Sequence, residues 1–344
     1  MLQHADVIID LQAGDTGKGK VAHHLLKTNT YNAVLRFNGG GNAGHTVYHN
    51  GQKVVTHAVP MGMLYGIPSV IGPGCVVNFP KLVSELNMLR DLGFKDKLYI
   101  DRKAHVTLDK HIQEDTGDTK LGTTRQGIGP TYRDKYNRTG TRVEDVVKYN
   151  RMEDSYVVID TFDMFYRDLH FPINTILCEG AQGFQLDIDW GDYPYVTSSH
   201  CTTGAVFLNG VAPRNLRRVF GIMKAYETYS GFKTFTNNTE DVELFDKIIE
   251  LGGEYGATTG RKRQIRWLHL DELIKALYIN GVTDLIINKA DILQQINTFP
   301  VVYQGYKTVF STFDEFKTFV ENVIVKEYKY SLFQITWSTS PETI

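Results

Sequence analysis

A glycine-rich segment near the start of the chain, QAGDTGKGK at residues 12–20, combines phosphate-binding groups with a carboxylate. Residues 14–20 fit the pattern G-x-x-x-x-G-K, directly after an apolar run and before a helix-like pattern, which is the context of a phosphate-binding loop. Glycines let backbone N–H groups converge on phosphate, and the helix N-terminus adds a positive dipole. Asp15 would repel a phosphate, so its position favours a magnesium ligand, a general base, or both.

A second glycine-rich segment, RFNGGGNAGHT at residues 36–46, ends in a histidine. An isolated histidine is usually a capping or core residue. His45, however, follows three consecutive glycines after a predicted strand, where ligands bind in open α/β sheets. We therefore keep two interpretations of His45, a catalytic group and a structural one.

The tetrapeptide NKAD at residues 288–291 follows the apolar run DLII. At a strand end, the carboxylate of such a motif accepts two hydrogen bonds from the edge of guanine, so Asp291 indicates a nucleotide-binding protein. A GTPase switch would carry D-x-x-G for the γ-phosphate, and this motif is absent from the sequence. Val21 also replaces the usual magnesium-binding hydroxyl after Lys20. An enzyme is favoured over a switch.

Two further segments carry polar groups beside glycines. GATTGRKRQIR at residues 256–266 places Arg261 and Arg263 behind a Gly/Thr turn, which suits bidentate pairing with a substrate carboxylate, although a solvated basic face is the alternative. EGAQGFQLDIDWGDYPYVTSS at residues 179–199 offers Gln182 and Thr197 after a predicted strand. By themselves these two residues identify no chemistry.

The elements that must position these groups are short apolar strands alternating with helical patterns. Continuous apolar strands of this kind predict an α/β fold with a mostly parallel central sheet covered by helices. The predicted strands lie at residues 6–12, 33–37, 69–74, 175–180, 217–226 and 284–291, and the predicted helices include 271–281 and 312–328. The polar segment at 109–142 is expected to be an ordered functional loop.

Composition excludes several classes of protein. The 37 Lys and Arg nearly balance the 39 Asp and Glu, so nucleic acid is not expected as the main partner. Cys75, Cys178 and Cys201 lack the spacing of a zinc site or a disulfide framework. No run is long and apolar enough to span a bilayer, and the start lacks the features of a signal peptide. We expect a cytoplasmic protein without a membrane partner.

Taken together, these segments resemble the adenylosuccinate synthetase family. The match rests on seven blocks in matching order and spacing: QAGDTGKGK, GGGNAGHT, GTTRQGIGPTYRDK, EGAQGFQLDID with YPYVTSS, GATTGRKR, NKAD and STSP. The length of 344 residues alone would suggest about two domains. Because the blocks of one active site run from end to end, the resemblance implies one catalytic domain, residues 1–344, with the adenylosuccinate synthetase fold and a P-loop-like phosphate site.

The resemblance also implies the chemistry of the central residues. The family joins aspartate to carbon 6 of a 6-oxopurine nucleotide in two steps. Asp15 matches the base that takes the proton from purine N1, and His45 matches the acid that stabilises the charge developing between the phosphates and O6. Asp15 and the Gly44 carbonyl match the ligands of Mg²⁺. Lys18 would brace the transferring phosphate.

The remaining site residues are implied by position-by-position matching. Matches to purine nucleotide and aspartate contacts are Asn42, Thr124, Arg138, Gln182, Thr197, Thr259, Arg261 and Arg263. Matches to the nucleoside triphosphate site are Gly14, Thr16, Gly17, Lys18, Gly19, Lys20, Gly44, Thr46, Lys289, Asp291, Ser338, Ser340 and Pro341. Arg138 matches an arginine that reaches the nucleotide of the neighbouring subunit, which implies a homodimer.

Departures from the family pattern bear on the substrate. Thr16 replaces a usual glutamate, Gly41 a usual histidine and Gln264 a usual arginine, and the chain is compact. This pattern is most similar to a phage branch that converts dGMP to N6-succino-2-amino-2′-deoxyadenylate for 2-aminoadenine DNA, with ATP as donor, in the host cytoplasm. A compact IMP-using enzyme, with GTP as indicated by NKAD, is the alternative. Thr16 belongs either to an altered purine site or only to the phosphate loop.

Overall fold

The computed structural model describes residues 1–49, 52–95, 97–147, 155–167, 171–235, 241–256, 260–340 and 344. Within these ranges no helix is both long enough and apolar enough to cross a membrane.

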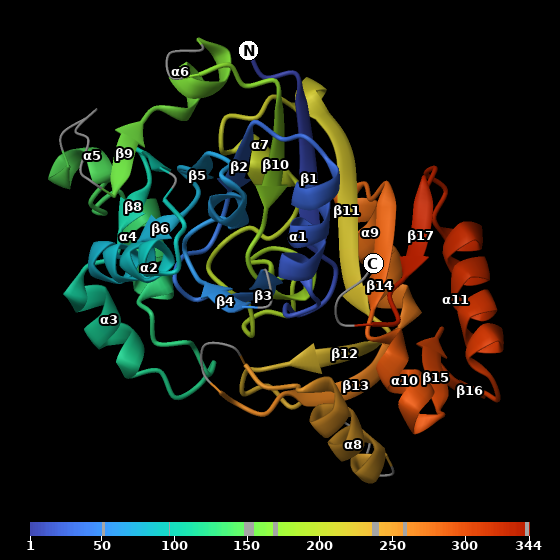
Figure 1. The fold of residues 1–344 in the computed structure, drawn as a ribbon. Helices are drawn as coiled ribbons and strands as arrows, with labels where there is room; N and C mark the ends of the chain where they lie inside the picture. The colour runs from blue at the N-terminus through green and yellow to red at the C-terminus, as the bar shows by residue number, and fades with distance from the viewer. Residues whose placement is uncertain are drawn as a thin grey trace.

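The largest element is a nine-stranded sheet in which every neighbouring pair of strands is parallel. Its spatial order is β17-β14-β11-β1-β10-β2-β5-β7-β9 (Figure 1). The strands are β1 (His4–Asp10), β2 (Ala33–Arg36), β5 (Ser69–Ile71), β7 (Leu98–Asp101), β9 (Tyr156–Ile159), β10 (Thr175–Glu179), β11 (Leu216–Lys224), β14 (Asp284–Asn288) and β17 (Gln334–Trp337). The predicted parallel sheet is confirmed.

Alternating side chains of each strand divide the interior into two cores, one on each face of the sheet. In β1, Val7 and Ile9 pack into one core and Ile8 packs into the other. The first core is shared with α6 (Thr161–Tyr166), α7 (Gly204–Phe207), α9 (Leu270–Asn280) and α11 (Phe313–Glu327). The second is shared with α1 (Lys18–Thr28), η1 (Met61–Tyr65) and α2 (Phe79–Asp91). Both faces are covered, which explains why the strands are apolar throughout.

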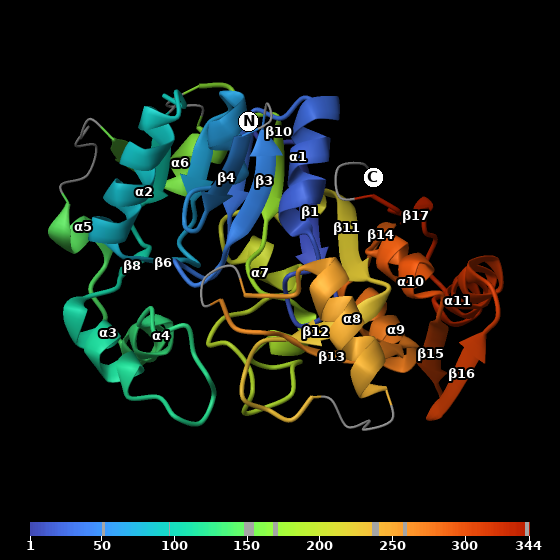
Figure 2. The same ribbon diagram turned by 60° about the horizontal axis from the view of Figure 1, so that its bottom comes forward.

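Smaller sheets surround the carboxyl ends of the central strands (Figure 2). A four-stranded sheet has the order β12-β13-β15-β16, and β3-β4 and β6-β8 are two-stranded. Their bounds are β3 (His45–His49), β4 (Gln52–Thr56), β6 (Val76–Val77), β8 (His105–Val106), β12 (Tyr226–Tyr229), β13 (Gln264–His269), β15 (Phe299–Tyr303) and β16 (Tyr306–Phe310). The other helices are α5 (Val143–Val146), η2 (Phe184–Leu186), η3 (Pro213–Asn215), α8 (Val242–Gly252) and α10 (Ala290–Ile296).

The segment at 109–142 is not one loop, contrary to the prediction. It contains α3 (Asp109–Thr116) and α4 (Ile128–Asn137). Their buried faces include polar groups: His111 Nε2 on α3 donates to Asp134 Oδ2 on α4 at 3.0 Å. Helices that bury polar side chains show no clear apolar periodicity, so the sequence pattern could not reveal them.

Candidate active site

The loop between β1 and α1 has a conformation that depends on its glycines. Gly14 and Gly17 have φ angles of 90° and 101°, and Asp15 shares the left-handed region at 58°. A Cβ atom at Gly17 would lie 2.7 Å from Asn288 Nδ2. That amide donates to the Thr16 carbonyl at 2.8 Å, so the NKAD segment holds the phosphate loop from outside.

Asp10, the last residue of β1, holds the phosphate loop in place. Its Oδ2 accepts hydrogen bonds from Thr16 Oγ1 at 2.6 Å and from Lys18 Nζ at 2.9 Å. Lys18 also donates to the Gln182 carbonyl at 2.6 Å. Thr16 is 1% exposed and faces Asp10 rather than the cavity described below. The Thr16 side chain therefore stabilises the phosphate loop, which favours the second of the two interpretations given to it.

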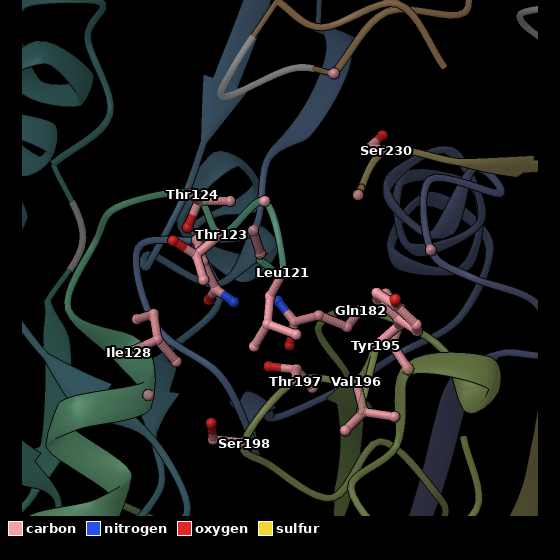
Figure 3. Close-up of a pocket in the computed structure, with 18 of the residues that line it drawn as sticks. Leu121, Thr123, Thr124, Ile128, Gln182, Tyr195, Val196, Thr197, Ser198 and Ser230 are labelled. Carbon is pink, nitrogen blue, oxygen red and sulfur yellow. The ribbon is translucent and has the colours of Figure 1, made fainter. Parts of the chain in front are cut away.

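A cavity of about 540 Å³ opens beside this loop (Figure 3). Ten of the predicted site residues line it, namely Gly14, Asp15, Lys18, Asn42, Gly44, His45, Thr124, Gln182, Thr197 and Arg261. The cavity thus unites segments from the ends of β1, β2 and β10 with the 117–127 loop. Parallel strands end at the same edge of a sheet, which is why these distant motifs meet.

Gln182 lines the cavity and carries a side-chain carbonyl that is unpaired within the described ranges. It has a φ angle of 57°, and its buried Oε1 has no hydrogen-bond partner among the residues that the structure describes. Thr197 and Ser198 face the same space, with Tyr195 and Leu121 on its walls (Figure 3). An unpaired buried carbonyl costs about 1–3 kcal/mol, which a donor on a ligand would relieve.

His45 begins β3 and is 6% exposed. Its Nε2 lies 3.4 Å from Arg36 Nη1, and its Nδ1 lies 3.7 Å from Glu179 Oε1, too far for a hydrogen bond. Burial, together with the charges of Arg36, Lys18 and His57, holds the pKa of His45 well below its usual value. At neutral pH the imidazole is uncharged and can donate one N–H.

The loop of residues 117–127, which lines another part of the cavity, is held by Asp118. Its carboxylate accepts four backbone N–H groups, from residues 120–123, at 2.8–3.2 Å. The carbonyl groups of Gly122 and Thr123 accept from Arg261 at 2.6 and 3.3 Å, and the Arg261 guanidinium lies 5.0 Å from the centre of the Phe232 ring. Arg261 thereby joins the two loops that flank the cavity.

Arg263 lies beside the cavity and pairs with Asp15, at 2.8 Å between Nη2 and Oδ2. Its Nη1 contacts Glu254 Oε2 at 2.5 Å. The proposed base is therefore already held by a cation in this structure, while its side chain stays 36% exposed.

At the other end of the loop, Lys20 turns away from the cavity. Its Nζ donates to Ser338 Oγ at 2.5 Å and to the Ser340 carbonyl at 2.6 Å. Lys289, with a φ angle of 65°, caps α10 and places Asp291 in the first helical turn. The residues matched to the donor base thus gather around the segment that follows β17.

Other predicted residues lie apart from the cavity. Arg138 is exposed at the end of α4, with a φ angle of 64°. Thr46 is exposed on β3, and Gly19 is buried in α1 against His45. Thr259 and Pro341 lie outside the described residues.

Sequence reasoning missed three buried carboxylates that organise the site, Asp10, Glu179 and Glu254. Each is at most 1% exposed. Asp10 and Glu179 end strands directly before glycine-rich motifs, a placement that could have marked them. Glu254 had no such signal: it follows no predicted strand, and its partners Arg263, Tyr226 and Lys224 lie 9, 28 and 30 residues away in the sequence.

Comparison with known proteins extends the resemblance along the whole chain. A family model described as adenylosuccinate synthetase matches residues 7–170 and 154–341. The adenylosuccinate synthetase of Bacteroides thetaiotaomicron is 40% identical over 337 residues, covering 85% of this chain and 79% of that protein. The enzyme of Christiangramia forsetii is 39% identical over 347 residues, covering 86% and 80%.

Solved structures share the fold. The fully ligated adenylosuccinate synthetase of Plasmodium falciparum matches with a TM-score of 0.81 and 28% identity over 96% of each chain. The cyanophage S-2L succinoaminodeoxyadenylate synthetase, bound to dGMP and to dATP as an energy donor, matches with a TM-score of 0.75 and 22% identity over 99% of this chain and 94% of that one. At 22% identity the second likeness establishes the fold alone.

Proposed function

The chain belongs to the adenylosuccinate synthetase family, and we propose that it joins L-aspartate to carbon 6 of IMP with GTP as phosphoryl donor. Members of this family are ligases that form a C–N bond at the expense of a nucleoside triphosphate. The observation that carries the proposal is that Asp15 lines one cavity together with Gln182, Thr197 and Arg261, the residues matched to the purine nucleotide.

In the proposed reaction Asp15 takes the proton from N1 of the purine, and O6 attacks the γ-phosphate of the donor. The P–O bond to the nucleoside diphosphate breaks, leaving a 6-phosphoryl purine. The aspartate amine then attacks C6, the C–O bond breaks with departure of phosphate, and the amine loses a proton. His45, uncharged at neutral pH, donates a hydrogen bond where negative charge develops.

Mg²⁺ fits the residues present. Asp15 has a partly exposed carboxylate and Gly44 has a backbone carbonyl, and both residues line the cavity. Oxygen ligands from protein and phosphate are those that Mg²⁺ prefers, and it commonly takes only one or two protein ligands. When bound, the ion would neutralise phosphate charge, and the Asp15 carboxylate would serve as its ligand in place of the hydroxyl that is missing after Lys20.

Guanine is the proposed donor base because Asp291 lies in the first turn of α10, beside Lys289 and near the Ser338–Ser340 segment. A carboxylate accepts two hydrogen bonds from the guanine edge, whereas adenine offers it only one donor group. The two relatives compared by sequence, at 40% and 39% identity, are also adenylosuccinate synthetases of bacteria.

A second candidate substrate is dGMP with ATP. It is favoured by the space at Gly41, where an added Cβ atom would meet nothing closer than Gln126 Oε1 at 3.9 Å. The family histidine would occupy this space next to Asn42, which lines the cavity, and Gly41 leaves the space open. Thr16 lends no support, since its side chain faces Asp10.

We further propose that the whole chain acts as one catalytic domain and works as a homodimer, with Arg138 reaching the partner's nucleotide. The exposure of Arg138 at the end of α4 supports this role.

One kinetic comparison tests the substrate. IMP, GMP and dGMP are each supplied with L-aspartate, Mg²⁺ and either GTP or ATP, and succinylated product is quantified by mass spectrometry. We expect the highest kcat/KM for IMP with GTP. A kcat/KM for dGMP exceeding that for IMP by about tenfold, or about 1.4 kcal/mol, would establish the second candidate instead.

A further inference from the structure

A buried charge network stands behind Arg263. It comprises Lys224, Tyr226, Glu254 and Arg263, and we call it the Glu254 network. Glu254 is 0% exposed, and its Oε2 accepts from Lys224 Nζ at 2.7 Å and from Arg263 Nη1 at 2.5 Å. Its Oε1 accepts from the Tyr226 hydroxyl at 2.6 Å. The two carboxylate oxygens thus have separate partners, so their functions can be separated by substitution.

The network fixes both the backbone and the side chain of Arg263. The Arg263 N–H donates to the Glu254 carbonyl at 3.0 Å, and the side chain is 10% exposed. Nη1 is held by Glu254, Nη2 pairs with Asp15, and Nε has no hydrogen-bond partner among the described residues. One edge of the guanidinium is therefore anchored by Glu254, and Nη2 is the donor that pairs with Asp15.

We propose that Glu254 is a positioning residue that presents Arg263 to a carboxylate of L-aspartate, and that Asp15 takes the place of this carboxylate while the substrate is absent. This inference rests on the proposed function, in which Arg263 contacts aspartate. Arrival of the substrate moves Arg263 Nη2 from Asp15 to the substrate, and Asp15 is then released to act as the base.

The charge balance of the network supports this arrangement. Burial alone would raise the pKa of Glu254, but the charges of Lys224 and Arg263 and the hydrogen bonds of the network outweigh burial and lower this pKa to about 2. Glu254 is therefore an anion at every working pH. An anchored guanidinium loses little freedom when it binds, which is the general advantage of a preorganised site.

Lys224 prevents Glu254 from neutralising Arg263 completely. Burial lowers the pKa of Lys224 to about 8, so near pH 7 its amine is still mostly charged, and Lys224 and Arg263 face Glu254 alone once Asp15 is displaced. One positive charge then remains for the substrate. Without Lys224, the buried pair of Glu254 and Arg263 would be neutral and would attract a carboxylate less strongly.

The test separates positioning from fold maintenance. In Glu254→Gln the charge that anchors Arg263 is lost. We expect the KM for aspartate to rise about ten- to 100-fold, because a binding group displaced by about 1 Å typically loses about that much. The kcat and the KM values of both nucleotides should change much less. Because this variant leaves Lys224 buried without a counter-charge, the double variant Glu254→Gln with Lys224→Met is measured beside it. Removing both charges leaves no unpaired buried ammonium at residue 224, so the double variant should fold, and we expect its aspartate KM to remain high.

Tyr226→Phe is the matched control. It removes a hydrogen bond to the other oxygen of Glu254 and leaves the Arg263 contact in place, so it should lower stability while the aspartate KM stays near the wild-type value. Recovery of a normal aspartate KM in the double variant would overturn the inference, because Glu254 would then serve only to neutralise Lys224.

Arg263→Leu distinguishes this inference from the proposed function. If this substitution leaves the aspartate KM unchanged, Arg263 does not contact aspartate and its assigned role fails. If it raises the aspartate KM while the double variant does not, only the role of Glu254 is overturned.

Discussion

Lys20 and Ser338 join the first and last parts of the chain, with 2.5 Å between Nζ and Oγ. The lysine of the phosphate loop thus holds the segment matched to the donor base. Burial lowers the pKa of Lys20 to about 8, with Asp291 raising it and Lys289 lowering it further. The amine therefore loses its proton, and its hydrogen bonds to this segment weaken, as the pH rises above about 8.

This pKa predicts selective labelling of Lys20. Near pH 8 about half of its amine is neutral, whereas an ordinary exposed lysine has a pKa of about 10.4 and is almost wholly charged. Reductive methylation followed by mass spectrometry should modify Lys20 faster than exposed Lys27, and GTP with Mg²⁺ should protect it. Equal methylation rates at Lys20 and Lys27 would contradict the lowered pKa of Lys20, and a lack of protection by GTP would contradict its place in the donor site.

Substitution of Asp15 should separate chemistry from binding. Loss of a general base costs about 10²- to 10⁴-fold in turnover, and loss of a metal ligand moves the effect toward the larger value. In Asp15→Asn we expect this fall in kcat, measured by phosphate release, with the fold intact. Aspartate should bind at least as tightly by calorimetry, since Asn competes less for Arg263. Near-normal turnover would exclude Asp15 as the base.

The lowered pKa of His45 predicts that the stability of the protein depends on pH. Its pKa is lowered in the folded protein, so below about pH 6.5 the unfolded chain binds a proton that the folded chain does not. The free energy of unfolding should then decrease as the pH falls, by up to about 1.4 kcal/mol per pH unit from this one group. Urea unfolding at several pH values should give a shallower decrease for His45→Gln. Parallel curves would mean that His45 titrates normally.

Thr16 should affect stability rather than substrate choice. A glutamate at this position would bury a second carboxylate against Asp10, which already accepts from the Thr16 hydroxyl. We expect Thr16→Glu to lower the free energy of unfolding by about 1–3 kcal/mol and to leave the preference between IMP and dGMP unchanged. Thr16→Ser, which keeps the hydroxyl, is the control. If a stable Thr16→Glu protein changed its preference between IMP and dGMP, the residue at position 16 would have to contribute to the purine site.

Arg138 predicts complementation between inactive subunits. If it contacts the partner's nucleotide, equal amounts of Arg138→Ala and Asp15→Asn should recover activity, because hybrid dimers regain one site with both residues intact. Complete exchange should give about a quarter of the wild-type rate. Mass spectrometry would verify the exchange. Hybrid dimers without activity would place Arg138 in its own subunit's site or in none.

The sequence by itself determined the parallel sheet and most of the cavity wall. Apolar runs such as 284–288 predicted buried strands, and motifs that follow strands, such as those of Asp15, Asn42 and Gln182, had to meet because parallel strands end at one edge. Only the tertiary structure decided what these groups face. Thr16 turned out to bond Asp10, and Arg263 to link Asp15 with Glu254. The reason is physical: local pattern records which residues are apolar, whereas the partner of a buried polar group depends on how the backbone turns, both within one loop, as for Thr16 and Asp10, and between distant segments, as for Asp15 and Arg263.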